Sequence, residues 1–153
     1  MPRLAALLAT ALLSSCSKPD QSRPAPAQVG PKELKEVEPN DSLERGTSIA
    51  EPVRIQAQLA VDAQRLDEDY SRIEALGPTK VARFEVSGVP GADIVLELLD
   101  RDGNHVATYD SEPEGVGEQI AQLNLGAPAV VKVSATKKGV GGAYTAQVSI
   151  ADA

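Results

Sequence analysis

The chain has 153 residues, of which 22 are acidic and 15 are basic, so its net charge is −7 at neutral pH. This balance argues against nucleic acid as a partner, because binding to a phosphate backbone depends on clustered basic side chains. One cysteine excludes an intramolecular disulfide, and one histidine excludes zinc sites with several His or Cys ligands.

The first element is an apolar stretch near the amino terminus. Arg3 precedes the apolar run Leu4 to Leu13, and small residues follow it. A helix of this length spans about 15 Å, half of a bilayer core, so a transmembrane span is excluded on length. We therefore predict a secretory signal peptide over residues 1–15.

A short motif closes the signal segment. Leu13-Ser14-Ser15-Cys16 resembles the lipobox of bacterial lipoproteins, in which the chain is cut before the cysteine. The resemblance implies a diacylglyceryl group on the Cys16 sulfur and an acyl chain such as palmitate on its amine, so the membrane is an expected partner. Ser17 replaces the aspartate that favours inner-membrane retention in enterobacterial lipoproteins. We therefore expect a lipid-anchored protein of the bacterial envelope, in the outer membrane, facing the periplasm or the cell surface.

Residues 16–35 contain four prolines and almost no large apolar side chain. Proline-rich segments stay extended at about 3.1 Å per residue, so this stretch would hold a domain up to about 50 Å from the lipid. We predict a disordered linker here, followed by one domain over residues 36–153.

The domain shows the alternation of apolar and polar residues that is typical of half-buried strands. The runs are Val53–Leu59, Ala82–Val86, Ile94–Leu98, Ala121–Leu125, Val131–Ala135 and Tyr144–Ile150. Glycine-rich and proline-containing turn signals separate them, which favours an all-β sandwich or barrel. The expected core includes Phe84, Leu96, Leu123, Val133 and Val148. A short helix is expected at most over residues 42–49 or 62–69.

Several segments resemble one domain family. They are Glu36-Val37-Glu38-Pro39-Asn40-Asp41-Ser42-Leu43, the acidic segment Asp67 to Ile73, the hairpin Asp100-Arg101-Asp102-Gly103 and the ending Gly141 to Val148. This pattern is similar to the bacterial pre-peptidase C-terminal domain family, from Glu36 to about Ile150. The resemblance implies a jelly-roll-like antiparallel β-sandwich of about seven or eight strands. It also implies a non-catalytic module that usually accompanies secreted proteases, whereas a lipid anchor takes the protease's place here.

The resemblance further implies a calcium site of the kind seen in clostridial relatives. Its expected ligands are Glu36, Glu38, Asn40, Asp41, Asp67 and Asp69. Calcium takes six to eight hard oxygens, and two acidic segments brought together supply them. Without a cation the carboxylates would repel one another. The alternative is that Asn40 to Ser42 cap a helix or turn and that Asp67 and Asp69 lie on a solvated loop.

The chain contains few side chains that are suited to nucleophilic or acid–base catalysis. His105 follows a predicted hairpin and is expected to be solvated, and the only thiol is the predicted lipid attachment site. The segment from Asp100 to Asn104 does not match an EF-hand, because glycine stands at the fourth position instead of the sixth. We therefore predict that the protein is not an enzyme.

The leading functional hypothesis is a membrane-anchored, non-catalytic β-sandwich that binds or scaffolds another envelope component. The expected partner is a protein. One alternative is a calcium-stabilised structural spacer without a specific partner. Another is a carbohydrate-binding module for an envelope polysaccharide. The four aromatic residues and the absence of tryptophan disfavour that last alternative, because glycan sites rely on aromatic platforms.

Overall fold

The computed structural model describes residues 30–153. The predicted signal peptide, Cys16 and the linker up to residue 29 lie outside this range. The described residues form ten strands and no helix: β1 (Lys32–Lys35), β2 (Thr47–Ile49), β3 (Val53–Leu59), β4 (Glu68–Ile73), β5 (Lys80–Val86), β6 (Ile94–Asp100), β7 (His105–Tyr109), β8 (Gln119–Asn124), β9 (Ala129–Ala135) and β10 (Gly142–Asp152).

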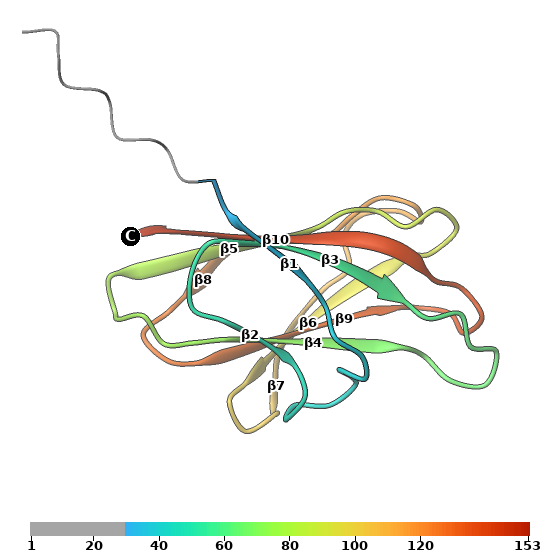
Figure 1. The fold of residues 1–153 in the computed structure, drawn as a ribbon, viewed down its shortest axis with the longest axis horizontal. Coiled ribbons are helices and arrows are strands. Elements are labelled where there is room, and N and C mark those ends of the chain that lie inside the picture. Colours follow the sequence, from blue (N-terminus) through green and yellow to red (C-terminus); the bar gives the residue numbers. More distant parts are fainter. Residues whose placement is uncertain (1–29) are drawn as a thin grey trace, which may run out of the picture.

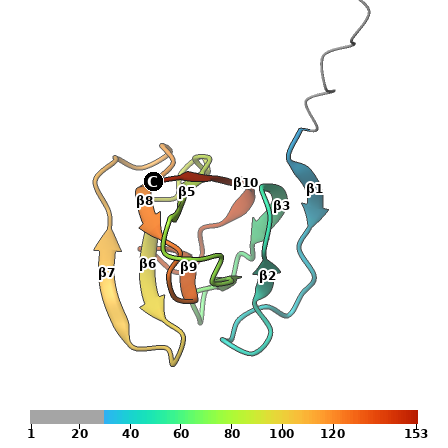
Figure 2. The ribbon, with the colours of Figure 1, turned by 90° about the vertical axis from the view of Figure 1, so that its left-hand side faces the viewer.

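Two five-stranded sheets lie face to face (Figure 1). The first sheet has the order β1-β3-β10-β5-β8, and the second has the order β2-β4-β9-β6-β7. The edge strands β1 and β2 lie on one side of the molecule, and β7 and β8 lie on the other (Figure 2). The predicted all-β sandwich is confirmed.

Alternation of side chains decides which face of each strand is buried. In β3 the burial alternates at every residue, with Val53, Ile55, Ala57 and Leu59 inward. The expected core is also confirmed, since Phe84, Leu96, Leu123, Val133 and Val148 are all buried. The buried apolar residues of the described chain run from Ile49 to Val148. The sandwich therefore contains its own core, which is the property of a domain that folds by itself.

The folded domain begins earlier in the sequence than predicted. β1 lies inside the expected linker and pairs in parallel with β3, with Leu34 opposite Ile55 and packed against the core. The domain thus starts at Lys32 and not at residue 36. β2 likewise pairs in parallel with β4. These short edge strands raise the strand number above the expected seven or eight.

Two other expectations are wrong in detail. Neither residues 42–49 nor residues 62–69 form a helix. In the first segment, the amides of Arg45 and Gly46 both bond to the Ser42 carbonyl, which closes a turn before β2. In β8, Ile120 and Leu123 are buried and Ala121 is exposed, because the register with β5 shifts between Ala82 and Phe84. Such a bulge reverses the faces that simple alternation predicts.

The packing predicts unequal effects of two truncations on β8. Ile120 is fully buried, so Ile120→Ala should lower the free energy of unfolding by about 2–5 kcal/mol. Gln122 is exposed on the same strand, so Gln122→Ala should change it by less than about 0.5 kcal/mol. Urea unfolding of residues 17–153 measures both values. Equal effects would contradict the described register of β8.

Candidate functional site

The segment between β1 and β2 crosses from the first sheet to the second (Figure 1). At its start, the Glu36 amide donates to the Gln56 carbonyl at 3.0 Å and so extends the pairing of β1 with β3. Further along, the Asn40 carbonyl accepts from the Tyr70 amide of β4 at 3.2 Å. The residues from Glu36 to Asn40 are therefore held against both sheets at one end of the sandwich.

Three carboxylates meet at this end. Glu36, Glu38 and Asp69 each place one carboxylate oxygen within 4.8 Å of the others, and we call these three residues the acidic cluster. Glu36 is half-buried and Glu38 is exposed. Asp69 comes from the core-facing side of β4 and is only 3% exposed. The cluster thus extends from the surface into the interior between the sheets.

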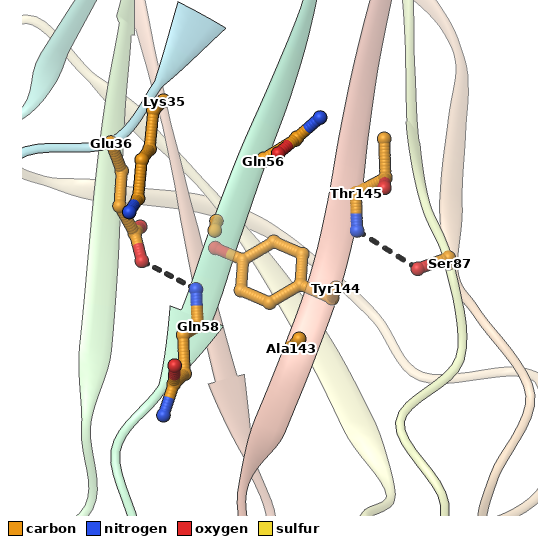
Figure 3. A pocket seen from close by; sticks show the side chains of 9 residues that line it. Lys35, Glu36, Gln56, Gln58, Ser87, Ala143, Tyr144 and Thr145 are labelled. Atoms are coloured by element: carbon orange, nitrogen blue, oxygen red, sulfur yellow. Dashed lines mark hydrogen bonds between the residues drawn. The ribbon is translucent and has the colours of Figure 1, made fainter.

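Hydrogen bonds hold the two glutamates in place. The Gln58 amide donates to Glu36 Oε1, as Figure 3 shows, and Asn40 Nδ2 donates to Glu36 Oε2 at 3.0 Å. The Asn40 amide donates to Glu38 Oε2 at 3.0 Å. Asn40 therefore organises both glutamates, which differs from the helix-capping role considered from the sequence.

A buried hydrogen bond holds Asp69 on the core side of the acidic cluster. The Tyr144 hydroxyl donates to Asp69 Oδ2 at 2.6 Å, and both residues are buried. Tyr144 lies on β10 of the first sheet and Asp69 on β4 of the second. This bond therefore links the two sheets beneath the acidic cluster.

Two buried oxygens at this place lack a hydrogen-bond partner among the described residues. They are Asn40 Oδ1 and Asp69 Oδ1. An unsatisfied buried acceptor costs about 1–3 kcal/mol, and more if it is charged, so native structures rarely keep one without a reason. A cation beside the three carboxylates is one partner that buried oxygens of this kind would accept.

Burial dominates the electrostatics of the cluster. It raises the pKa of Asp69 to about 8, and the nearby carboxylates of Glu36, Asp67 and Glu38 push it upward as well, whereas the Tyr144 hydrogen bond opposes the rise. Burial also raises the pKa of Glu36 above its ordinary value. The pKa of the Tyr144 hydroxyl lies well above its usual range for the same reason, with Asp69 adding to it.

The structure brings together five of the six predicted ligand residues. Besides the acidic cluster and Asn40, Asp67 borders the same hollow as the two glutamates, and its Oδ2 accepts from the Ala60 amide at 2.5 Å. Asp41 is paired with cations instead: its carboxylate contacts Arg65, which borders the same hollow, at 2.7 Å and Arg45 at 3.9 Å. Its charge is therefore balanced by two guanidinium groups.

Sequence reasoning missed the role of Tyr144 at this site. The alternation in the last strand places Tyr144 on the buried face, and a buried phenol needs a hydrogen-bond partner. Counting back by twos from Ile73 along β4 likewise places Asp69 on the core face. The sequence could therefore have placed Tyr144 and Asp69 on the inner faces of their strands. It could not have shown that the two side chains pair with each other across the sheets.

Two open hollows adjoin the cluster. The first, drawn in Figure 3, lies over β3 and β10 and is bordered by Lys35, Glu36, Gln56, Ala57, Gln58, Ser87, Ala143, Tyr144 and Thr145. The second, which we call the cluster hollow, is bordered by Lys35, Glu36, Glu38, Gln58, Ala60, Arg65 and Asp67. Of these two hollows, only the cluster hollow is bordered by Glu38 and Asp67.

Other candidates from the sequence are structural. Asp100 Oδ1 accepts from the amides of Asp102 and Asn104 at 2.9 Å, and Gly103 has a φ of 85°, so this segment is the predicted hairpin turn. His105 is exposed and contacts the Thr108 hydroxyl. None of these groups joins the acidic cluster.

The aromatic residues form no exposed platform in residues 30–153. Phe84 and Tyr144 are buried, and Tyr70 and Tyr109 are half-buried. In the same range, no helix has the length and apolar character needed to cross a membrane.

No family model matches the chain, and a search of curated proteins also found no match. Among solved structures, the chain is similar to the pre-peptidase C-terminal domain of collagenase from Bacillus anthracis, with 12% identity and a TM-score of 0.49. The match covers 68% of this chain and 94% of that domain. A likeness at this level assigns no function.

The raised pKa of Asp69 predicts how stability depends on pH when a chelator removes cations. Between the ordinary Asp value of 3.8 and about 8, the folded state binds a proton that the unfolded state has lost. Stability should therefore fall as pH rises through this window and level off above it. Asp69→Asn removes the titrating group, so its melting temperature should fall much less over the same range. Parallel curves for the two proteins would contradict the assignment.

Proposed function

We propose that this protein is a lipid-anchored, non-catalytic β-sandwich of the bacterial envelope whose domain is stabilised by calcium. In this proposal it binds or scaffolds another envelope component. The predicted signal peptide and lipobox support the anchor, with Cys16 as the lipidated residue. The observation that carries the calcium part is the pair of buried oxygens of Asn40 and Asp69 that have no hydrogen-bond partner among residues 30–153, near the carboxylates of Glu36 and Glu38.

The chemistry of this donor set favours calcium among divalent ions. All four side chains offer oxygen, which suits a hard cation, and none offers the imidazole nitrogen or thiolate sulfur that zinc prefers. The donors come from an irregular segment and a strand, and calcium tolerates irregular geometry better than magnesium, which requires a near-ideal octahedron. A bound cation would also neutralise the repulsion between the carboxylates.

Calcium binding to the folded state should raise the melting temperature of residues 17–153, because a ligand that binds only the native state stabilises it. We expect a rise of several degrees with millimolar calcium and a smaller one with magnesium. Glu38→Gln combined with Asp69→Asn should abolish the rise. Asp41→Asn should retain most of it, because Asp41 pairs with arginines instead.

Asp110→Asn is a matched control for lost acidic charge, since Asp110 is exposed and lies outside the cluster. It should respond to calcium as the wild type does. A melting temperature that is the same in calcium and in chelator would refute the calcium proposal. Loss of the rise in Asp41→Asn alone would favour the ligand set expected from the sequence.

The anchor is tested by Cys16→Ala in cells. Without the thiol no diacylglyceryl group can be attached, so the variant should lose metabolic fatty-acid label and leave the membrane fraction. Ser14→Ala, a small change in the same motif that keeps the cysteine, should remain labelled. A Cys16→Ala protein that stays membrane-bound after normal processing would show that the anchor lies elsewhere.

A further inference from the structure

The hydroxyl of Tyr144 engages one carboxylate oxygen of Asp69 and leaves the other free. It donates to Oδ2 at 2.6 Å, whereas Oδ1 accepts no hydrogen bond from any of residues 30–153. Because both oxygens belong to one rigid, planar carboxylate, a bond that holds Oδ2 also fixes the direction of Oδ1. The tyrosine therefore determines how Asp69 presents its free oxygen.

The two partners of this bond are anchored on different sheets. Tyr144 lies on β10, the central strand of the first sheet, where it pairs with Ala57 of β3. Asp69 lies on β4 of the second sheet, where it pairs with Val133 of β9. Both side chains are buried, so the packed core limits their movement. The Tyr144 hydroxyl is thus a fixed point to which Asp69 is attached.

The other candidate ligands come from a different part of the fold. Glu36, Glu38 and Asn40 lie on the segment between β1 and β2 and are joined by hydrogen bonds from Asn40 to both glutamates. Glu36 and Tyr144 border the same hollow, and Figure 3 shows the hydroxyl end of the tyrosine ring directed towards the side of Glu36. The site therefore has two halves, the crossing segment and the core-anchored Asp69.

The size of a cation decides how closely these two halves must approach. Magnesium requires ligand oxygens at about 2.0–2.1 Å, whereas calcium takes them at about 2.3–2.6 Å. To close around the smaller ion, Asp69 would have to move towards the crossing segment and away from Tyr144. A buried hydrogen bond of 2.6 Å resists that movement, because breaking it would leave both of its partners unsatisfied.

We propose that Tyr144 is a positioning residue of the calcium site and sets its preference for calcium over magnesium. Its hydroxyl holds Asp69 at the spacing that suits the larger ion and does not itself bind the ion. This inference rests on the calcium site proposed above. It gives the buried bond a role in ion selection in addition to its role in joining the sheets.

Tyr144→Phe removes the hydroxyl and keeps the ring in the core. Isothermal titration of residues 17–153 should show calcium affinity reduced about tenfold or more, which is the usual loss when the hydrogen-bond partner of a metal ligand is removed. Magnesium affinity should not fall, because binding of the smaller ion already requires Asp69 to leave the hydroxyl. A ratio of calcium to magnesium affinity equal to that of the wild type would overturn the proposal.

Tyr70→Phe is the matched control for the loss of a tyrosine hydroxyl beside a carboxylate. Tyr70 follows Asp69 on β4, so its side chain lies on the opposite face of the sheet, and its hydroxyl donates to Glu68 at 3.4 Å. This variant should bind both cations as the wild type does. The same loss of calcium affinity in both variants would contradict a specific role of Tyr144.

Melting temperatures separate positioning from a purely structural role. Tyr144→Phe should melt below the wild type even in chelator, because a buried hydrogen bond is lost. If the bond also positions Asp69 for the cation, the difference between the two proteins should be larger in millimolar calcium than in chelator. Equal differences in the two conditions would show that the bond is structural only.

Terbium provides a test that leaves Tyr144 in place. This ion occupies calcium sites and emits light when a tyrosine close to it is excited. The chain has three tyrosines and no tryptophan, so Tyr70→Phe with Tyr109→Phe leaves Tyr144 as the only sensitiser. The double variant should keep the sensitised emission of the wild type, and calcium should displace it. Bound terbium without this emission would contradict the placement of Tyr144 beside the ion.

The outcomes distinguish this inference from the proposed function. If the wild type binds neither calcium nor terbium, the calcium site fails and this inference fails with it. If the wild type binds calcium and Tyr144→Phe keeps its affinity and its selectivity, the calcium site stands and only the role of Tyr144 is overturned.

Discussion

The hydrogen bond from Tyr144 to Asp69 is the constraint around which this end of the sandwich is built. It joins a strand of each sheet at 2.6 Å in a buried environment. Asp69 occupies a core-facing position of β4 that alternation would give to an apolar residue. A carboxylate there is costly unless it is protonated or paired, so its neighbours must satisfy it. The Glu36 to Asn40 segment lies over this group and brings further acidic and amide side chains to it.

The same segment has two roles that depend on each other. It carries the chain from the first sheet to the second, and it presents Glu36, Glu38 and Asn40 to Asp69. Backbone bonds at both of its ends fix it to β3 and β4. A cation bound here would tie the crossing to both sheets, so its stabilising effect would act on the junction of the layers and not on one loop.

The sequence was a good guide where burial alone decides structure. The alternation in β3, β5 and β10 predicted their buried faces, because one face of each sheet packs against the other sheet and the opposite face meets solvent. β9 departs from this pattern, since six of its seven residues are buried. The alternation did not predict β1, where a single apolar residue, Leu34, stands among charges and pairs with a strand distant in sequence. Five of the six residues predicted as ligands lie together, whereas the Asp41 carboxylate pairs with Arg65 and Arg45, which compete for it. Such competition depends on loop paths that local patterns do not encode.

The parallel pairing of β1 with β3 has a mechanical consequence. The chain enters β1 at Lys32 and runs alongside β3 towards Gln56. A pull on the preceding segment along the axis of β1 would load the evenly spaced hydrogen bonds of the pair together in shear. Glu36, bonded to Gln56 and Gln58, lies at the far end of this ladder and resists sliding after Lys32 has begun to move.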